Sequence, residues 1–245
     1  MLTVMNNSVG NTARLLGAGL RALIVLTVLC GVLYPLAVTG AAQALFPDKA
    51  NGSEIEDGGR VVGSALIGQR YDLPLRKGQE TPAPDLKWFQ PRPSNGLGTN
   101  VINTRYKLIL SGATNLAGDS GAKKTDGGKK EVCDPEAKEG LCAQVLAARN
   151  AVIKDNSTAG HTVRPADIPA DAVTSSGSGL DPHISPKYAK LQVHRVAERN
   201  GLDVASVTKL VEDNTDERIL GFIGEPRVNV LKLNIDLRHL AADKG

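Results

Sequence analysis

A short polar segment of the sequence carries the three residue types of a hydrolytic triad. Ser176, Ser178, Asp181 and His183 all lie within the stretch SSGSGLDPHIS. A serine activated by a histidine that an acid orients can attack an acyl carbon, but known triads draw their members from separate parts of a fold. A nucleophilic serine also needs a strand-to-helix elbow, which SSGSG does not resemble. The pattern therefore favours a structural turn at Asp181, and a hydrolase that uses Ser178, Asp181 and His183 is the alternative.

Two further segments offer weaker signs of chemistry. Glu225 and Arg227 place an acid close to a base, which indicates an ion pair or a turn before the last element more than a site. The tripeptide Leu110-Ser111-Gly112 matches the start of an ATP-cassette signature, but three residues carry little weight. No paired carboxylates stand out for acid–base work. We therefore expect no catalytic residue in this chain, and we leave any cofactor-binding residues open.

The three cysteines bear on metal binding and on the compartment. Cys133 and Cys142 lie close together in a polar segment, without the CxxC spacing or a nearby histidine cluster that a zinc site needs. We expect no metal site. A disulfide between them would close a short loop and would persist outside the cytosol. Two unrelated thiols are the alternative.

A long apolar run lies near the N-terminus of the chain, before all of these residues except Cys30. No charged residue occurs between Ala22 and Phe46. About 20 helical residues cross a bilayer core of about 30 Å, so the run predicts a transmembrane helix. A cleaved signal peptide is the alternative, because Ala42-Gln43-Ala44 resembles a cleavage site. Signal-peptide apolar regions are shorter, at about 7–15 residues, which favours a retained anchor.

The charges that flank the apolar run predict its orientation. Arg14 and Arg21 precede it, and no acidic residue occurs before Asp48. Positive residues favour the cytoplasmic side of a membrane. We therefore expect a cytoplasmic segment at 1–21, a membrane helix at 22–46 and an external domain at 47–245.

Composition limits what the external domain can do. The chain has 29 basic and 26 acidic residues, a net charge of +3, which gives no case for nucleic acid binding. Aromatic residues make up only 3%, too few for a stacking platform. A single membrane helix encloses no polar path, so this chain alone cannot conduct a solute.

The external part predicts a mixed α/β domain, so the fold class is α+β with one N-terminal transmembrane helix. Trp88 is expected to anchor a loop onto the core, and the polar segment at about 118–140 reads as an exposed, mobile insertion. Local patterns predict the following elements: one or two strands with a tight turn at 58–72, helices at 141–153, 185–199 and 204–212, and a strand at 228–237 with a bulge near Val230.

Several segments together resemble the C subunit family of the bacterial Kdp potassium-transporting P-type ATPase. They occur in the family's order and span the chain from the apolar run to the C-terminus. The segments are LRALIVLTVLCGVLYPL from Leu20, GSALIGQRYD from Gly63, WFQPRPS from Trp88, SGATNLA from Ser111, SGSGLDPHIS from Ser176, QVHRVAERNGL from Gln192 and GEPRVNVLKLN from Gly224. Pro91 stands where the family usually has glycine, and 77–85 and 118–140 look like insertions.

The resemblance implies an accessory, non-catalytic subunit of an ATP-driven, high-affinity potassium uptake complex. Its implied partners are a potassium-binding, channel-like subunit, an ATP-hydrolysing P-type subunit and membrane lipid, and not nucleic acid. The implied location is the bacterial inner membrane, single-pass, with the bulk of the chain in the periplasm. The family is described as assisting assembly and raising the ATP affinity of the pump subunit. No cofactor of its own is implied, and ATP would be shared with the pump subunit. A stand-alone anchored binding module is a further alternative.

Overall fold

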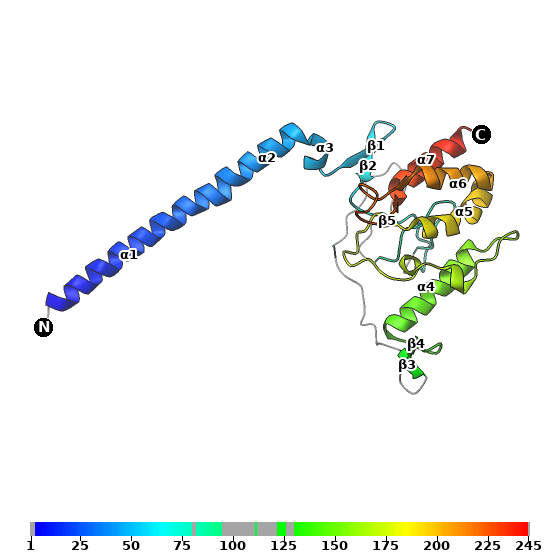
Figure 1. Ribbon diagram of the computed structural model, residues 1–245, viewed down its shortest axis with the longest axis horizontal. Coiled ribbons are helices and arrows are strands. Elements are labelled where there is room, and N and C mark those ends of the chain that lie inside the picture. The colour runs from blue at the N-terminus through cyan, green and yellow to red at the C-terminus, as the bar shows by residue number, and fades with distance from the viewer. Residues whose placement is uncertain (1–2, 80–81, 95–110, 112–121, 126–129, 245) are drawn as a thin grey trace. The chain divides into compact units, whose positions relative to one another are not determined.

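The computed structural model describes residues 3–79, 82–94, 111, 122–125 and 130–244. The chain divides into two compact units, Met1–Ser53 and Glu54–Gly245. The first unit is a long helical rod (Figure 1). Its elements are α1 (Thr3–Val28), a π-helical turn (Leu29–Leu33), α2 (Tyr34–Leu45) and the short α3 (Pro47–Ala50).

The π-helical turn ends at Leu33, two residues before Pro35. Proline has no N–H, and its ring clashes with the carbonyl four residues earlier, which here belongs to Gly31. The wider turn accommodates this clash, since the N–H of Tyr34 donates to the carbonyl of Leu29, five residues back. The helix therefore continues through the proline.

The rod is long and apolar enough to cross a membrane. The stretch Gly10–Leu45 has 36 residues, and its most apolar window has a mean hydropathy of 2.3. At a rise of about 1.5 Å per residue it is about 54 Å long, so only part of it is needed to cross a bilayer core of about 30 Å. The predicted membrane helix at 22–46 falls at the C-terminal end of this stretch, which suits a membrane anchor.

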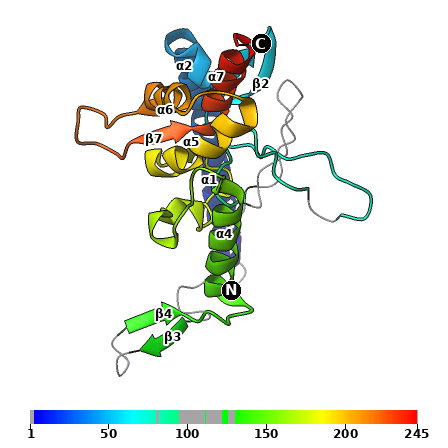
Figure 2. The ribbon, with the colours of Figure 1, turned by 90° about the vertical axis from the view of Figure 1, so that its right-hand side faces the viewer.

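The second unit is a mixed helix and sheet domain, as the sequence predicted. A three-stranded antiparallel sheet has the order β5 (His183–Ile184), β7 (Arg227–Asn229), β6 (Thr215–Asp216). Helices α5, α6 and α7 gather around β7, and α4 lies below them in Figure 2. These helices span Gly140–Asn156 (α4), Pro186–Asn200 (α5), Val204–Asp213 (α6) and Val230–Ala242 (α7).

Two hairpins extend this domain. Strands β1 (Glu54–Asp57) and β2 (Arg60–Ser64) pair across a turn of two glycines with positive φ. The prediction of strands at 58–72 is correct only for β2, since its partner strand precedes the glycines. Strands β3 (Ala122–Thr125) and β4 (Lys130–Cys133) also pair. The sequence predicted no strand there, and the rest of the segment 118–129 lies outside the described residues.

Local capping signals explain why α5 and α6 begin and end where they do. The Ser185 side chain accepts a hydrogen bond from the N–H of Tyr188, and Pro186 takes the first helical position. Gly201 ends α5 with a φ of 62°, a conformation that favours glycine. Asp203 then caps α6 by accepting from the N–H of Ser206 at 2.7 Å. The predicted helices at 185–199 and 204–212 are thus confirmed, as is the helix at 141–153.

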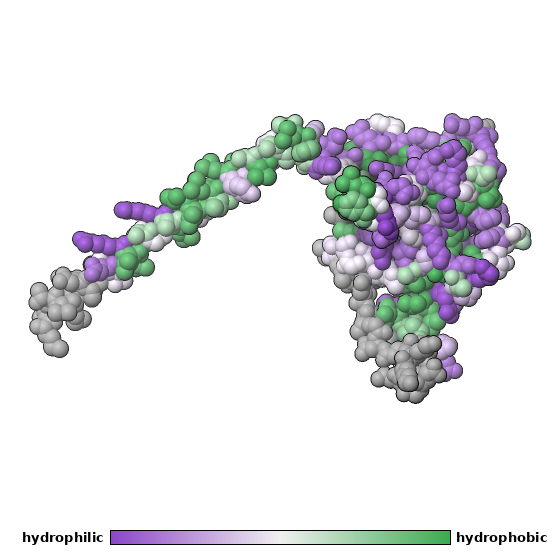
Figure 3. Space-filling model, in the orientation of Figure 1, coloured by the Kyte–Doolittle hydropathy of each residue, from purple (hydrophilic) through white to green (hydrophobic). Residues whose placement is uncertain are grey.

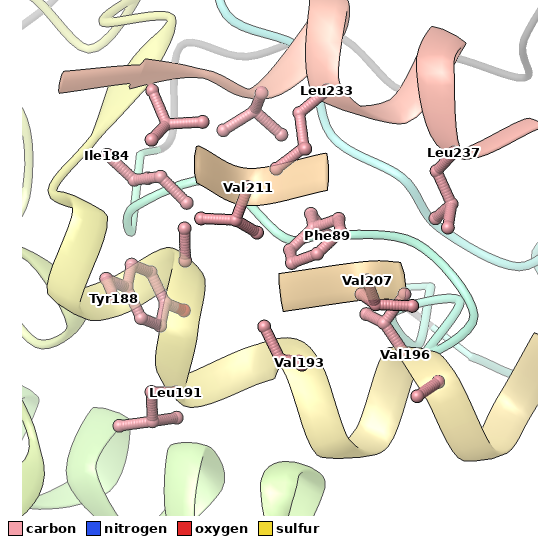
Figure 4. Close-up of a cluster of buried hydrophobic side chains, with 14 of the residues drawn as sticks. Phe89, Ile184, Tyr188, Leu191, Val193, Val196, Val207, Val211, Leu233 and Leu237 are labelled. Atoms are coloured by element: carbon pink, nitrogen blue, oxygen red, sulfur yellow. The ribbon is translucent and has the colours of Figure 1, made fainter. Parts of the chain in front are cut away.

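The core fills the space between α5, α6, α7 and the sheet (Figure 4). Phe89 from the loop before Gln90 is fully buried there, and Trp88 packs against the same cluster, so the predicted anchoring role of Trp88 is confirmed. The helix residues that close this core include Tyr188, Leu191, Val193, Val196, Val207, Val211, Leu233 and Leu237.

The predicted strand at 228–237 is wrong. Only β7 is extended, and the chain turns into helix α7 at Val230, where the Asn229 side chain accepts from the N–H of Lys232. Alternate leucines suggested a strand, but at 100° per residue they form two opposite faces of a helix. Leu233 and Leu237 enter the main core, while Leu231 and Ile235 pack on Val62 of β2. A helix buried on both sides therefore produced the strand-like pattern.

Candidate functional site

The segment with the candidate catalytic residues forms a loop before β5 that is held by Arg92. Arg92 Nη1 lies 3.2 Å from Asp181 Oδ2. Arg92 Nη2 donates to the carbonyl oxygens of Thr174 and Ser175, both at 3.2 Å. One guanidinium thus fixes the start and the end of the loop, and it lies in a segment that is distant in sequence.

Asp181 is an acceptor that organises the turn into β5. Its Oδ1 accepts from the N–H of His183 at 2.9 Å and lies 3.5 Å from His183 Nδ1. Burial raises the pKa of the Asp181 carboxyl, but hydrogen bonds from His183 and Arg92 outweigh burial and lower this pKa from 3.8 to about 2. Asp181 is therefore a carboxylate at neutral pH, as the turn interpretation of Asp181 and His183 requires.

The serines of the loop make contacts within it. Ser176 Oγ lies 3.0 Å from Ser178 Oγ, and these oxygens accept from the N–H groups of Gly179 and Leu180, respectively. In the part of the chain that the structure describes, no hydrogen bond joins Ser178 to His183. The geometry brings Asp181 to His183 but not Ser178 to His183, so the pair that would activate a serine nucleophile is not assembled.

The loop borders a hollow of about 700 Å³. Its charged lining residues are Arg92, Asp171, Asp181, Lys187, Glu225 and Arg227, and His183 also lines it. Most of these charges already have partners: Arg92 contacts Asp181, and Asp171 accepts from the backbone and hydroxyl of Ser185. The hollow has mixed charge and is built from helix-capping and turn contacts.

Glu225 and Arg227, the candidate acid and base before the last helix, do not pair with each other. Glu225 accepts from Arg218 at 2.8 Å, and Arg227 lies 3.9 Å from Asp216. Both contacts link the two arms of the hairpin that joins β6 to β7. Glu225 and Arg227 thus form ion pairs, but with other partners than each other. Of the tripeptide 110–112 only Ser111 is described, and its hydroxyl donates to the carbonyl of Ser178 at 2.8 Å.

The cysteine pair forms a disulfide between β4 and α4. Cys133 and Cys142 are joined, with their Cα atoms 5.1 Å apart. Among the described residues, no group of three His, Cys, Asp or Glu side chains is placed to hold a metal ion. The cysteines thus stabilise the junction between the β3–β4 hairpin and α4.

A buried polar network, which sequence reasoning missed, fixes the segment from Leu86 to Gln90. Arg195 of α5 is 2% exposed and donates to the carbonyls of Leu86 and Trp88. Burial lowers the pKa of its guanidinium to about 10, so it stays charged at neutral pH. Gln192 accepts from the N–H of Gln90 at 2.7 Å and donates to its carbonyl at 3.1 Å. The only sequence signal was the presence of two polar residues, three apart, beside the apolar positions of an amphipathic helix.

Asn234 of α7 completes this network from the other side. It accepts from the N–H of Phe89 and donates to the carbonyl of the same residue, both at 2.9 Å. This pair of bonds satisfies the buried backbone of a loop as a neighbouring strand would. The aromatic segment is therefore clamped between α5 and α7.

Comparison with known proteins shows which family the chain belongs to. Residues 16–239 match the family described as KdpC, the c chain of the K+-transporting ATPase. The chain belongs to the KdpC family. It is 66% identical to the potassium-transporting ATPase KdpC subunit of Streptomyces avermitilis, over 97% of this chain and 99% of that relative. The corresponding subunit of Streptomyces coelicolor is 63% identical over 97% of this chain and 98% of its own length. That of Rhodospirillum rubrum is 43% identical over 86% of this chain and 89% of its own length.

Four of the seven segments that carried the resemblance to the KdpC family meet at this site. WFQPRPS meets SGSGLDPHIS through the contact of Arg92 with Asp181. It also meets QVHRVAERNGL through Gln90 and Gln192, and GEPRVNVLKLN through Phe89 and Asn234. In this KdpC member these four segments thus hold one another, and their polar residues form a structural framework.

Proposed function

We propose that this chain is an accessory, non-catalytic subunit of an ATP-driven, high-affinity potassium uptake complex. The observation that carries the proposal is the match to the KdpC family over nearly the whole chain. The geometry agrees, because the polar residues of the shared segments hydrogen-bond one another instead of forming a nucleophile and base pair. Its partners would be a potassium-binding, channel-like subunit and an ATP-hydrolysing P-type subunit.

We place the N-terminus in the cytoplasm and the domain that begins at Glu54 outside. Support comes from Arg14 and Arg21 before the apolar run and from Asp48 after it. Protease added to right-side-out vesicles should then digest the domain while protecting the N-terminal residues. Digestion only after the vesicles are opened would overturn this orientation. N-terminal sequencing that begins near Leu45 would show a cleaved signal in place of an anchor.

In this orientation the domain lies across the membrane from the cytosolic ATP pool. An effect on the ATP affinity of the pump subunit would then be indirect, through the conformations that the partner subunits adopt. The domain would favour the partner conformation that binds ATP more tightly. Assembly would be the second role, with the helix Gly10–Leu45 packing beside the membrane helices of its partners.

A deletion strain tests the proposal. Deleting this chain, with the other subunits still expressed, should abolish growth at limiting potassium and leave growth at high potassium normal. A plasmid that encodes the chain should restore growth, and so should one that encodes the Ser178→Ala, His183→Ala variant. Normal growth of the deletion strain at limiting potassium would contradict the proposal.

A further inference from the structure

The hairpin that joins β6 to β7 exposes an apolar tip. This tip consists of Ile219, Leu220, Phe222 and Ile223, which are 64%, 79%, 71% and 48% exposed. It projects away from the sheet in Figure 2, and in Figure 3 it forms a hydrophobic patch beside hydrophilic surface. None of the four residues belongs to either hydrophobic cluster of the described domain. A contiguous apolar patch with a polar rim marks an interaction surface.

The tip has a defined backbone conformation. Ile219 and Ile223 exchange both backbone hydrogen bonds, at 2.9 and 3.0 Å, and the N–H of Gly221 donates to the carbonyl of Arg218 at 3.1 Å. Most N–H groups of the tip are therefore satisfied inside the hairpin and need no water. This lets the tip enter an apolar environment without leaving those donors unpaired.

Leu220 occupies a position that normally selects against leucine. Its φ is +53° and that of Gly221 is +81°. Tight hairpins fill such positions with asparagine, aspartate or glycine, because a side chain like leucine is disfavoured at positive φ. A leucine that is 79% exposed gains no burial within the domain in return. Burial within the domain therefore does not account for a leucine at this position.

The charges on the two arms of the hairpin indicate which surface it contacts. Arg218 pairs with Glu225, and Arg227 lies near Asp216. Glu217 adds a further negative charge, so the arms are slightly acidic. Segments that insert into lipid surfaces combine apolar residues with lysine and arginine, which anionic lipids attract. The acidic arms therefore favour a protein surface over the bilayer.

The anchor keeps the domain close to membrane-embedded proteins. Eight residues lie between Leu45, the end of the apolar helix, and Glu54, the start of β1. Even fully extended they would span only about 30 Å. A tether of this length gives a high effective concentration at the membrane surface, so a contact made by a few side chains is sufficient.

We propose that this apolar tip docks into an apolar pocket on the external face of another subunit of the same transport complex. The inference rests on the proposed function, because it requires such a subunit. It adds the residues and the chemistry of one contact: Leu220 and Phe222 enter the pocket, and the charged arms meet its polar rim.

Photo-crosslinking in the intact complex identifies the occupant directly. Phe222 is replaced by a photoreactive phenylalanine analogue, and native membranes that hold all subunits are illuminated. The expected product joins this chain to a second, different subunit. An adduct with lipid, an adduct with a second copy of this chain, or no adduct above that of an analogue placed at exposed Leu75 would overturn the proposal.

A charge substitution tests whether the contact matters for assembly. The Leu220→Asp, Phe222→Asp variant should reduce recovery of the other subunits with this chain by at least about tenfold, as loss of an interface hot spot does. Leu66 and Leu75 are also exposed leucines, so the Leu66→Asp, Leu75→Asp variant is a matched control that should retain recovery. Thermal unfolding of both variants confirms that the domain is folded.

The deletion strain separates the two proposals. If deletion abolishes growth at limiting potassium while the tip variant assembles as the control does, the docking inference alone is wrong. If deletion has no effect on growth, the proposed function is wrong as well.

Discussion

Arg92 and Asp181 lie 89 residues apart in sequence and meet at 3.2 Å between Nη1 and Oδ2. The contact joins the loop that follows Phe89 to the loop that precedes β5. The same guanidinium donates to Thr174 and Ser175, so it closes the loop around Ser176 and Ser178. The residues that resembled a hydrolytic triad are thus held in place by an arginine that no triad requires.

Asp181 should make the stability of the domain depend on acid pH. Its pKa falls to about 2 in the fold, against about 3.9 in an unfolded chain. The contribution is therefore complete above about pH 4 and is lost as the pH falls from about 4 to about 2. Because the carboxyl is partly exposed, solvent screening reduces the contribution to about 1 kcal/mol. We expect the Asp181→Asn variant to be less stable than the wild type by this amount at pH 7.

Urea unfolding followed by the fluorescence of Trp88 measures this difference at several pH values. The gap between wild type and Asp181→Asn should shrink toward zero by about pH 2. The Asp167→Asn variant is the control, because Asp167 forms an exposed ion pair with Arg164 and should change stability much less. A gap for Asp181→Asn that stays constant with pH would show that its charge is not responsible.

Two substitutions in α7 distinguish a helix from the strand that the sequence suggested. In a strand Asn234 and Asp236 would share one face, so their substitution by alanine would change the unfolding free energy by similar amounts. In α7 Asn234 is fully buried and makes two bonds to Phe89, whereas Asp236 is exposed and accepts from Asn214. The Asn234→Ala variant should lose about 2–4 kcal/mol of unfolding free energy, since two backbone groups are left unsatisfied. The Asp236→Ala variant should lose less than about 0.5 kcal/mol, and equal losses would favour a strand.

The disulfide between Cys133 and Cys142 should stabilise the domain. It closes a loop of about 10 residues, for which the chain-entropy model gives about 2.5 kcal/mol. The Cys133→Ser, Cys142→Ser variant should therefore lose about 2.5 kcal/mol of unfolding free energy and unfold at a lower urea concentration. Reductant should have the same effect on the wild type. The Cys30→Ser variant should behave as the wild type does, because Cys30 is a free thiol. Unchanged stability under reductant would contradict this role.

Local signals in the sequence were sufficient for the helices that have clear ends. Ser185-Pro186, Gly201 and Asp203 act through neighbouring backbone groups, so they could be recognised without tertiary information. The strand predicted at 228–237 failed for the opposite reason. Whether Leu231 and Ile235 are buried depends on β2, which lies far away in sequence.

The contacts of the site could be predicted only in part. The turn at Asp181 is local, and it was predicted from the residues that form it. The partners of Arg92, Gln192 and Asn234 lie far away in sequence, so nothing local specified them. Their segments were nevertheless recognised by their resemblance to family motifs.

Potassium-stimulated ATP hydrolysis by the purified complex, with and without this chain, tests the central claim most directly. The complex is isolated in mild detergent, and its rate is measured over a range of ATP concentrations. We predict that two large membrane subunits copurify with the chain, and that the complex without it hydrolyses ATP with a higher KM or fails to remain assembled. An unchanged KM and an intact complex in the absence of the chain would contradict its role as an accessory subunit.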